Sequence, residues 1–494
     1  MQQVERRMRS EYLVNRDEIL MAQRDWAETP LRSRVAVIRN LRKRIASDAR
    51  VIAEMVPTRL PGALYRTQAD TLVSEVLPLI DACRFLEREA EKILQEKKLG
   101  TRGRPFWLSG VDSTVERVPL GTVLIVGAAN YPLFLAGVQT IQALVAGNAV
   151  LWKPAPGTTA PAFALRALLL ESGLDPELLT LLEPEDDSAA SAIEAGVDHV
   201  VLTGSAETGR VVLRQLAETL TPATMELSGC DAVFMLSGAD LERVLRALRF
   251  GLRLNGSCTC MAPRRVFLVG LDDGEASRVE ARLAAELRGL MWVPAPLKTV
   301  DRLRLLIEDA GEQGADVVLD GLHEFEVSKV IGMTLILRAA PSLLAMQADI
   351  FAPILSVMRT ADAGEALAAN GACPYALTAA VFGPARDARV LASKLRVGNV
   401  LINDLVIPTV DPRIPFGGRG RSGFGVTRGA EGLLAMTTPR TIQVQRRRSK
   451  RPYEPTGEKH VELFAGLAAL LHGEGFGLRW DGLMRVIRAA RKLK

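Results

Sequence analysis

Residues 121–153 read GTVLIVGAANYPLFLAGVQTIQALVAGNAVLWK, and this stretch decides the fold. The uncharged run that contains it, 118–152, is long enough to cross a bilayer. Gly127, Pro132 and Gly147 interrupt it, and these residues are typical of turns rather than of a spanning helix. The stretch therefore predicts a strand, a turn, a helix and a second strand.

The same alternation continues along the chain. Strands are predicted at 122–127, 149–153, 179–182 and 199–203, and helices at 133–146, 160–172, 189–195 and 208–220. Strands separated by helices of this length predict a parallel sheet covered by helices. Amphipathic helices are expected over 34–96, and a second α/β domain is expected from 265 to 401. The fold class is α/β.

Composition indicates an ordinary globular protein of two to four domains. The chain has 494 residues, of which 48% are hydrophobic and 24% are charged. Its net charge is +5, but residues 440–494 hold 13 Lys or Arg against 5 Asp or Glu, which leaves 49 basic and 52 acidic residues before them. The excess positive charge belongs to a tail, so a nucleic-acid partner is not expected.

A second stretch, 255–265, places Cys258 and Cys260 one residue apart in a turn of small residues. Such a thiol reacts only when a neighbour favours its thiolate or takes its proton, and Glu226 is a candidate partner. From residue types alone, an inert buried cysteine and a solvated glutamate remain open, as does a redox pair. The four histidines are scattered and the other cysteines lack ligand spacing, so we expect no metal.

Three loops follow predicted strands of the first domain, where ligands collect in open α/β sheets. They carry Asn130, Lys153 and the segment from Gly204 through Ser205 to Gly209. The last segment opens a helix and could offer backbone N–H groups to a dinucleotide pyrophosphate, although an ordinary helix start has the same appearance. The glycine-rich segment 415–425 is predicted to be a structural turn.

Taken together, these segments resemble the aldehyde dehydrogenase superfamily in order and spacing over roughly 108–441. The branch with fatty and aromatic aldehyde dehydrogenases is the most similar. The matching segments are Ala129 to Pro132, Leu151 to Pro154, Leu202 to Gly209, Glu226 to Gly229, Asn255 to Arg265, Ile350 to Pro353 and Pro415 to Gly425. The resemblance implies a Rossmann-type cofactor domain, a catalytic α/β domain and a small β extension for oligomerisation.

The resemblance also implies roles for single residues in NAD(P)-dependent oxidation of an aldehyde to a carboxylic acid. Cys260 is the implied nucleophile, Asn130 the oxyanion donor and Glu226 the base that activates water. The implied cofactor residues are Lys153, Gly204, Ser205, Gly209, Asp349 and Phe351. NAD and NADP both stay open, because Pro156 stands where an acidic ribose-binding residue is common.

Several residues depart from the family pattern near the implied site. Ser228 and Ser257 replace glycines, Cys258 replaces a glutamine, and Asp349 replaces a glutamate. These departures leave two alternatives: a catalytically weak binding or scaffold protein, and an enzyme that transfers the acyl group to coenzyme A. The presence of Glu226 favours hydrolysis over such transfer. Cys258 is expected to pack in the turn, and a reversible link to Cys260 under oxidation is the other hypothesis.

The expected domain organisation follows from the resemblance. A cofactor domain covers 1–228, a catalytic domain 229–436, an oligomerisation strand 437–448 and a basic amphipathic tail 449–494. A hairpin at 107–118 is expected to join the oligomerisation extension of a homodimer or homotetramer. An N-terminus without an apolar signal core and an odd number of cysteines indicate the cytoplasm. The tail predicts attachment to an anionic membrane surface or docking on protein.

Overall fold

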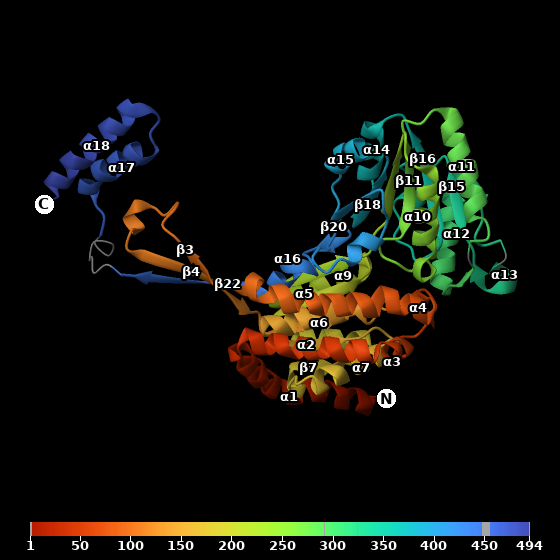
Figure 1. The fold of residues 1–494 in the computed structure, drawn as a ribbon, viewed down its shortest axis with the longest axis horizontal. Helices are drawn as coiled ribbons and strands as arrows, with labels where there is room; N and C mark the ends of the chain where they lie inside the picture. The colour runs from red at the N-terminus through yellow and green to blue at the C-terminus, as the bar shows by residue number, and fades with distance from the viewer. Residues whose placement is uncertain (1, 291, 324, 447–454, 494) are drawn as a thin grey trace. The chain divides into compact units, whose positions relative to one another are not determined.

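The structure is a computed structural model that describes residues 2–290, 292–323, 325–446 and 455–493 (Figure 1). The chain forms two compact units. The large unit is Met1–Glu96 with Glu116–Arg440, and the small unit is Lys97–Val115 with Thr441–Lys494.

The first sheet of the large unit has six strands in the order β21-β9-β8-β5-β6-β7. Every neighbouring pair is parallel except β21 with β9. The strands are β5 (Thr122–Val126), β6 (Ala149–Lys153), β7 (Leu179–Leu181), β8 (His199–Gly204), β9 (Ala223–Leu227) and β21 (Gly423–Phe424). The predicted parallel sheet is confirmed, and 423–424 of the predicted turn at 415–425 form its edge strand.

Helices pack on this sheet as the alternating pattern predicts. Helix α6 (Phe134–Ala146) is buried on every face, and α2 (Leu31–Ser47) and α5 (Leu77–Leu94) lie against it (Figure 1). The others are α1 (Gln2–Glu28), α3 (Ala49–Met55), α4 (Gln68–Thr71), α7 (Thr159–Glu171), α8 (Asp186–Ala195), α9 (Ala206–Thr219) and α16 (Gly429–Ala435).

The turn between α6 and β6 shows how the sequence fixes this packing. Gly147 ends the helix with φ 100°, a left-handed conformation that favours glycine. The buried Asn148 amide accepts hydrogen bonds from the backbone N–H groups of Leu120 and Gly121 and donates to the carbonyls of Ala143 and Met436. One side chain therefore joins α6, the start of β5 and the end of α16.

The second sheet has seven strands in the order β13-β15-β16-β11-β10-β18-β19, and only β13 is antiparallel to its neighbour. These strands are β10 (Asp231–Leu236), β11 (Pro263–Val269), β13 (Asp316–Leu319), β15 (Thr334–Leu337), β16 (Ile354–Thr360), β18 (Thr378–Phe382) and β19 (Asn399–Ile402). Its main helices are α10 (Leu241–Arg253), α11 (Asp273–Leu287), α12 (Leu297–Glu312), α14 (Ala363–Gly371) and α15 (Ala385–Ala392). Separate apolar clusters cover its two faces.

The small unit contains a three-stranded sheet and a helical hairpin. The sheet order is β22 (Thr437–Gln445), β4 (Val111–Pro119) and β3 (Lys97–Leu99). The expected hairpin within 107–118 is wrong, because 111–119 form a single strand whose antiparallel partner is β3. The predicted pairing with a strand near 441–445 is found.

Helices α17 (Val461–His472) and α18 (Gly475–Lys492) form the hairpin and pack closely through Gly466 and Gly482. Part of the expected tail, 449–454, lies outside the described residues. Across the described chain, the helices are too short or too polar to traverse a bilayer.

Candidate active site

The turn that carries both cysteines connects α10 to β11 through strained backbone. Asn255, Gly256 and Ser257 all have left-handed φ values, of 50°, 63° and 64°. A non-glycine residue in this region costs free energy, so surrounding contacts must hold it there. Gly256 is required, because a Cβ at this position would lie 2.6 Å from the Tyr65 Cβ.

The Asn255 side chain supplies much of that support. Its amide nitrogen donates to the carbonyls of Ala63, Asn130 and Cys258 at 2.9, 3.0 and 3.3 Å, and its oxygen accepts from the Tyr65 N–H at 3.1 Å. Asn130 is also buried, and its Nδ2 donates to the Cys258 carbonyl at 3.0 Å. The structure therefore brings the predicted oxyanion donor to the cysteine turn.

Cys260 lies half-buried at the end of this turn. Burial raises the pKa of its thiol, and the nearby Glu226 and Asp231 carboxyls raise it further. The Arg428 guanidinium and the Met261 backbone N–H act in the opposite direction. The pKa of the Cys260 thiol is therefore above its ordinary value, with a carboxyl group and a cation in its surroundings.

Glu226 is the predicted base, and β9 places it in the environment of Cys260. Its Oε2 accepts a hydrogen bond from the Thr427 hydroxyl at 2.8 Å, whereas its Oε1 has no partner among the described residues. Burial raises the pKa of Glu226, opposed by the Arg428 charge and the Thr427 hydrogen bond. A buried carboxyl group with one free oxygen is suited to proton transfer near neutral pH.

Arg428 is the site residue that the sequence analysis missed. Its guanidinium is buried, lies 4.2 Å from the Phe416 ring centroid and 5.7 Å from that of Phe134, and donates to the Thr409 carbonyl at 2.7 Å. Burial lowers the pKa of Arg428, but Glu226 and Cys260 favour its charged form. The available signal was an arginine three residues after the end of the glycine-rich segment at 415–425.

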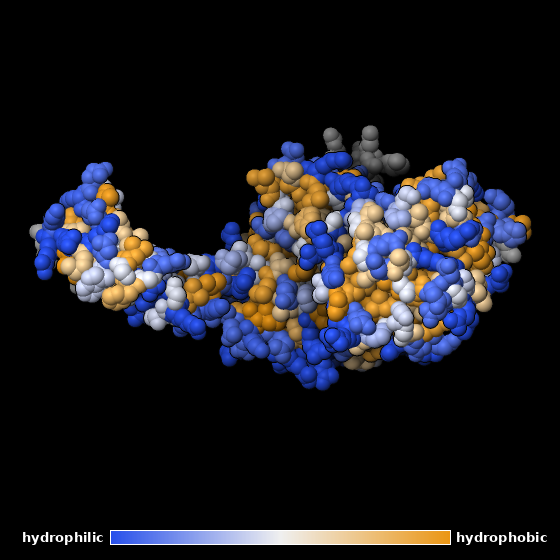
Figure 2. Space-filling model, turned by 90° about the horizontal axis from the view of Figure 1, so that it is seen from above, coloured by the Kyte–Doolittle hydropathy of each residue, from blue (hydrophilic) through white to orange (hydrophobic). Residues whose placement is uncertain are grey.

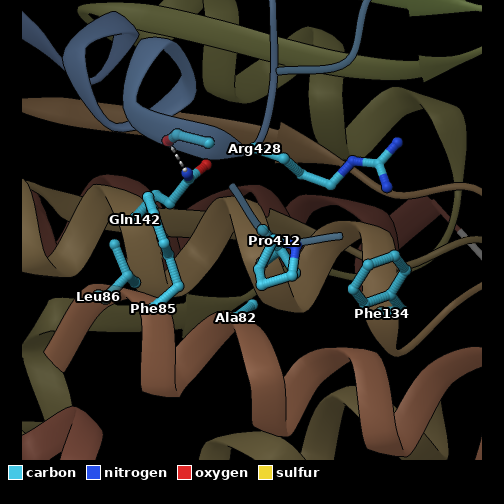
Figure 3. Close-up of a pocket in the computed structure, with 9 residues that line it drawn as sticks. Ala82, Phe85, Leu86, Phe134, Gln142, Pro412 and Arg428 are labelled. Atoms are coloured by element: carbon cyan, nitrogen blue, oxygen red, sulfur yellow. Dashed lines mark hydrogen bonds between the residues drawn. The ribbon is translucent and has the colours of Figure 1, made fainter. Parts of the chain in front are cut away.

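A narrow cavity begins at Arg428 and continues between α5 and α6 (Figure 3). Its volume is about 10 Å³, which is room for roughly one water molecule. Except for Arg428 and Gln142, its lining is apolar or glycine: Ala82, Phe85, Leu86, Phe134, Val138, Pro412 and Gly429. Figure 3 shows the hydrogen bond from Gln142 to the Gly429 carbonyl, which is 3.2 Å long.

Four residues depart from the family pattern, and three of them, Ser228, Ser257 and Asp349, are connected by polar contacts and one charge interaction. The Ser228 hydroxyl donates a short hydrogen bond to Asp349 Oδ2. The buried Arg264 donates to Ser257 Oγ at 2.8 Å and to its carbonyl at 2.6 Å, and the charges of Arg264 and Asp349 interact. Burial raises the pKa of Asp349, while Ser228 and Arg264 lower it. The Ser228 and Ser257 hydroxyls therefore each have a hydrogen-bond partner, Asp349 and Arg264 respectively.

The carboxyl ends of β5, β6 and β8 carry Asn130, Lys153 and Ser205 at one edge of the first sheet. Strand order reverses between β5 and β8, and such a switch point is where nucleotides bind in open α/β sheets. Lys153 is buried, and its Nζ lies 3.0 Å from the highly exposed Asp186. A dinucleotide fits this edge, because it provides a buried cation and the N-terminus of the 14-residue α9.

The remaining predicted cofactor residues have defined positions and contacts in the structure. Ser205 is the N-cap of α9 and accepts from the Thr208 N–H at 3.1 Å, and Gly204 ends β8. A Cβ at Gly209 would lie 2.9 Å from Leu227, so this glycine allows α9 to approach β9. Phe351 is half-buried two residues after Asp349, in the loop before β16.

The other cysteines divide into two kinds. The Cys258 thiol is 5% exposed and points to the Gly256 carbonyl at 3.7 Å. The side chains of Cys230 and Cys373, which are 143 residues apart in sequence, interact with each other, and this interaction lowers the pKa of Cys373. The Cys230 thiol also lies 4.0 Å from the Ala345 carbonyl. The two thiols that interact are therefore outside the nucleophile turn. Within the described chain, no group of three His, Cys, Asp or Glu could hold a metal.

Comparison with known proteins agrees with this geometry. The aldehyde dehydrogenase family model matches residues 16–442. A 4,4'-diapolycopene aldehyde oxidase from Methylomonas sp. is 28% identical over 460 residues, covering 91% of this chain and 85% of that protein. A Mycobacterium tuberculosis protein provisionally named succinate-semialdehyde dehydrogenase [NADP(+)] 2 is 27% identical, covering 87% and 83%.

Among solved structures, a Mycobacterium tuberculosis aldehyde dehydrogenase complexed with NAD+ has the same fold. Its TM-score is 0.75 at 24% identity, with 84% of this chain and 86% of that chain covered. The family match spans most of the chain. The protein is therefore a member of the aldehyde dehydrogenase family, an oxidoreductase that acts on aldehydes.

Proposed function

We propose that this protein oxidises an aldehyde to a carboxylic acid with NAD or NADP, using Cys260 as nucleophile and Glu226 as base. The observation that carries the proposal is the surroundings of Cys260. Its thiol shares a buried environment with Glu226, which has a free carboxyl oxygen, and with the Arg428 cation. Neither alternative, scaffold or acyl transfer to coenzyme A, requires a buried base beside the thiol.

The cofactor edge of the first sheet would hold the dinucleotide. Ser205 and the start of α9 would meet the pyrophosphate, Lys153 the adenosine ribose, and Asp349 with Phe351 the nicotinamide ribose. When bound, NAD or NADP supplies the acceptor for a hydride. Pro156 provides no carboxylate to repel a 2′-phosphate, so both cofactors suit the site.

In the first half of the reaction, the Cys260 thiol loses its proton to solvent, and its sulfur attacks the aldehyde carbon as thiolate. The carbon–sulfur bond forms while the carbonyl π electrons move to oxygen, giving a tetrahedral oxyanion. The Asn130 amide and the Cys260 backbone N–H stabilise this charge, and one such donor typically contributes roughly 3 to 4 kcal/mol. Loss of hydride from this carbon re-forms the carbonyl and leaves a thioester on Cys260.

In the second half, Glu226 removes a proton from water through its free Oε1. The water oxygen attacks the thioester carbon, the carbon–sulfur bond breaks, and Cys260 leaves as thiolate with the carboxylic acid as product. The raised pKa of Glu226 suits this step, because it makes the carboxylate a stronger base than an exposed one.

The substrate that we propose is an aldehyde with an apolar body. The observation that supports this choice is the name of the Methylomonas relative, 4,4'-diapolycopene aldehyde oxidase. The cavity next to Arg428 is not the place for the substrate body, because its volume is about 10 Å³. Burial of an apolar body against protein would contribute about 25 cal/mol for each Å² of hydrocarbon that is removed from water.

Absorbance of NADH or NADPH tests the function directly. Aldehydes of increasing chain length are mixed with each cofactor, with and without coenzyme A, and Cys260→Ala is the control. We expect turnover without coenzyme A and free acid as product. Turnover that requires coenzyme A would favour acyl transfer, and no turnover with any aldehyde would favour a scaffold.

We also propose that the small sheet assembles this protein into a homodimer or homotetramer, with the domain boundaries expected from the sequence. The edge strand β22 is exposed along almost its whole length, and an exposed edge can pair with another chain. Native mass spectrometry checks this: the full chain should give an even oligomer, and Val444→Pro should weaken it. A monomeric full chain would contradict the proposal.

For location, we propose the cytoplasm, with contact to an anionic membrane surface through α17 and α18. All five cysteines are free, as a reducing compartment favours. The hairpin exposes Phe464, Phe476 and Trp480 near basic residues, and Figure 2 shows hydrophobic beside hydrophilic residues there, at the left. More of the full chain than of a chain ending at Gln443 should co-sediment with anionic vesicles. Equal sedimentation of the two chains would contradict the proposed membrane contact.

A further inference from the structure

A buried ion pair, Arg66 with Glu75, contacts the loop that carries Asn130. Arg66 follows β2 (Leu64–Tyr65), and Glu75 belongs to a π-helical turn (Leu72–Val76) between α4 and α5. The side chain of Arg66 is 1% exposed and that of Glu75 is 0% exposed. Turns of this type are rare and often occur at functional sites. No step of the proposed reaction uses these two charged groups.

Glu75 anchors the start of α6. Its Oε2 accepts hydrogen bonds from the backbone N–H groups of Leu133 and Phe134 at 2.7 and 2.9 Å. Burial raises the pKa of Glu75, whereas the Arg66 charge and these two N–H groups lower it. The positive end of the helix dipole also favours a carboxylate at this place. Glu75 thus fixes the end of the loop between β5 and α6, in which Asn130 lies.

Arg66 connects Glu75 to Asn130 through separate nitrogen atoms. One terminal nitrogen donates to Glu75 Oε1, and the other donates to the Asn130 carbonyl at 3.3 Å. The guanidinium carbon also lies 5.3 Å from the centroid of the Tyr131 ring. A guanidinium group is a planar fork of N–H donors, so it can hold two acceptors in fixed directions at once. Arg66 therefore restrains both Asn130 and Tyr131.

The cysteine turn restrains the same two residues of the loop. Asn255 Nδ2 donates to the Asn130 carbonyl at 3.0 Å, and the hydroxyl oxygens of Tyr131 and Thr259 lie 2.8 Å apart. With its backbone held in this way, Asn130 directs one amide hydrogen to the Cys258 carbonyl. A side-chain amide has two N–H hydrogens, so the second is left for the oxyanion.

Stability alone does not explain a charged pair in this place. The cost of taking two charges out of water can exceed their attraction, and apolar residues of similar volume often stabilise a protein equally well. An apolar pair, however, could not donate to the Asn130 carbonyl. We propose that Arg66 and Glu75 are positioning residues that set the direction of the Asn130 amide toward the oxyanion. This inference rests on the proposed role of Asn130 in the reaction.

The test compares two reactions of the Cys260 thiolate on the full chain. Its attack on p-nitrophenyl acetate forms a tetrahedral oxyanion and then releases p-nitrophenolate, whereas its alkylation by iodoacetamide displaces iodide without an oxyanion. The pair variant combines Arg66→Met with Glu75→Leu. The matched control combines Arg42→Met with Glu87→Leu, which removes an ion pair between α2 and α5. Circular dichroism and thermal unfolding establish that both variants are folded.

We expect the pair variant to release p-nitrophenolate at least about tenfold more slowly and to react with iodoacetamide within about twofold of the natural rate. The control variant should match the natural chain in both reactions. Asn130→Ala should slow the ester reaction by itself. Adding the pair variant to Asn130→Ala should cause no further loss, because the pair acts through Asn130. In aldehyde oxidation, the pair variant should lower kcat more than it changes KM.

An unchanged ester rate in the pair variant, equal slowing of both reactions, an equal loss in the control, or a further loss on top of Asn130→Ala would overturn the inference. A natural ester rate in Asn130→Ala would overturn the proposed role of Asn130 itself, and the inference with it. If the pair variant does not fold, Arg66→Lys replaces it, because lysine offers one nitrogen where arginine offers two. We expect it to slow the ester reaction at least about threefold with normal alkylation, and an unchanged ester rate would overturn the inference.

Discussion

Cys258 and Cys260 lie two residues apart in one turn, yet their surroundings differ. Cys258 is almost fully buried, points to a backbone carbonyl and has Arg264 as a charged neighbour. Burial raises its pKa to about 12. Cys260 is more exposed and lies near Glu226, Asp231 and Arg428, which come from two other parts of the chain.

This difference teaches that the turn alone does not select a nucleophile. The proposed reaction needs a thiol with access for substrate, a base and a charge that can favour its thiolate. Of the two thiols, Cys260 is the more exposed one, and Glu226 and Arg428 lie near it. Substitution of the groups that distinguish the two thiols is therefore the most direct test of the comparison.

Removal of the Cys260 thiol should have the largest effect. We expect Cys260→Ala to lower kcat at least about 10³-fold, because no other group near the site can form the thioester. Steady-state NAD(P)H absorbance measures this change. Cys258→Ala is the matched control and should retain most activity. A similar loss of kcat in both variants would mean that activity depends on the intact turn rather than on the Cys260 thiol.

Glu226→Gln should have the next largest effect, because it removes the base and keeps the hydrogen bond to Thr427. We expect kcat to fall about 10² to 10⁴-fold while one equivalent of NAD(P)H still forms in a burst. Intact-mass spectrometry should then detect the acyl group on Cys260. Unchanged steady-state turnover, or a variant without the burst, would contradict the assignment of Glu226 to the hydrolytic half.

The charges around Cys260 predict opposite changes in its pH dependence. Its pKa is raised, so the thiolate fraction and the rate of iodoacetamide alkylation should increase with pH. Arg428→Gln removes a charge that lowers this pKa and should slow alkylation at a given pH by roughly tenfold. Glu226→Gln removes a charge that raises it and should speed alkylation. Shifts in the same direction for both variants would contradict the geometry.

Oxidation should distinguish the thiols in another way. With hydrogen peroxide, the Cys373 thiolate forms a sulfenic acid, and Cys230 then displaces water to give a disulfide. The interaction between their side chains favours this link over one between Cys258 and Cys260. Peptide mapping by mass spectrometry without reductant should therefore find 230 linked to 373. A reductant-reversible link of 258 to 260 would instead support the adjacent pair.

The smallest effect is expected for the stability of Cys258→Ala. The change removes one buried sulfur from the turn, and a loss of about 1 kcal/mol in unfolding free energy is typical of such a truncation. Chemical denaturation measures it. A loss several times larger would show that Cys258 holds the strained backbone of Asn255 and Ser257 in place.

Most of the first sheet could be predicted, because long strands and helices alternate with clear periodicity. Predicted and observed limits of β5, β6 and β8 agree within one residue. The edge strand β21 could not be found this way, since two residues carry no periodic pattern. The expected hairpin at 107–118 failed because the partner of β4 lies upstream, at 97–99.

For the site, the family resemblance placed Cys260, Glu226 and Asn130, and the structure brings these three residues to one turn. No pattern in the sequence identifies the side chains that contact these residues. Thr427 and Arg428 reach Glu226 across about 200 residues, and Ser228 meets Asp349 across 121. Such contacts depend on how two sheets are placed against each other, which local pattern does not encode.

The edge strand β21 has a consequence for how the protein is made. Gly423 and Phe424 pair with β9 beside Glu226, but they follow all seven strands of the second sheet in the chain. During synthesis on the ribosome, the β9 edge of the first sheet stays unpaired until residues 423 and 424 have been made. Nascent chains with an open edge are prone to wrong pairing. Completion of the base-bearing strand is therefore a late event in biosynthesis, and chaperone dependence should be greatest just before it.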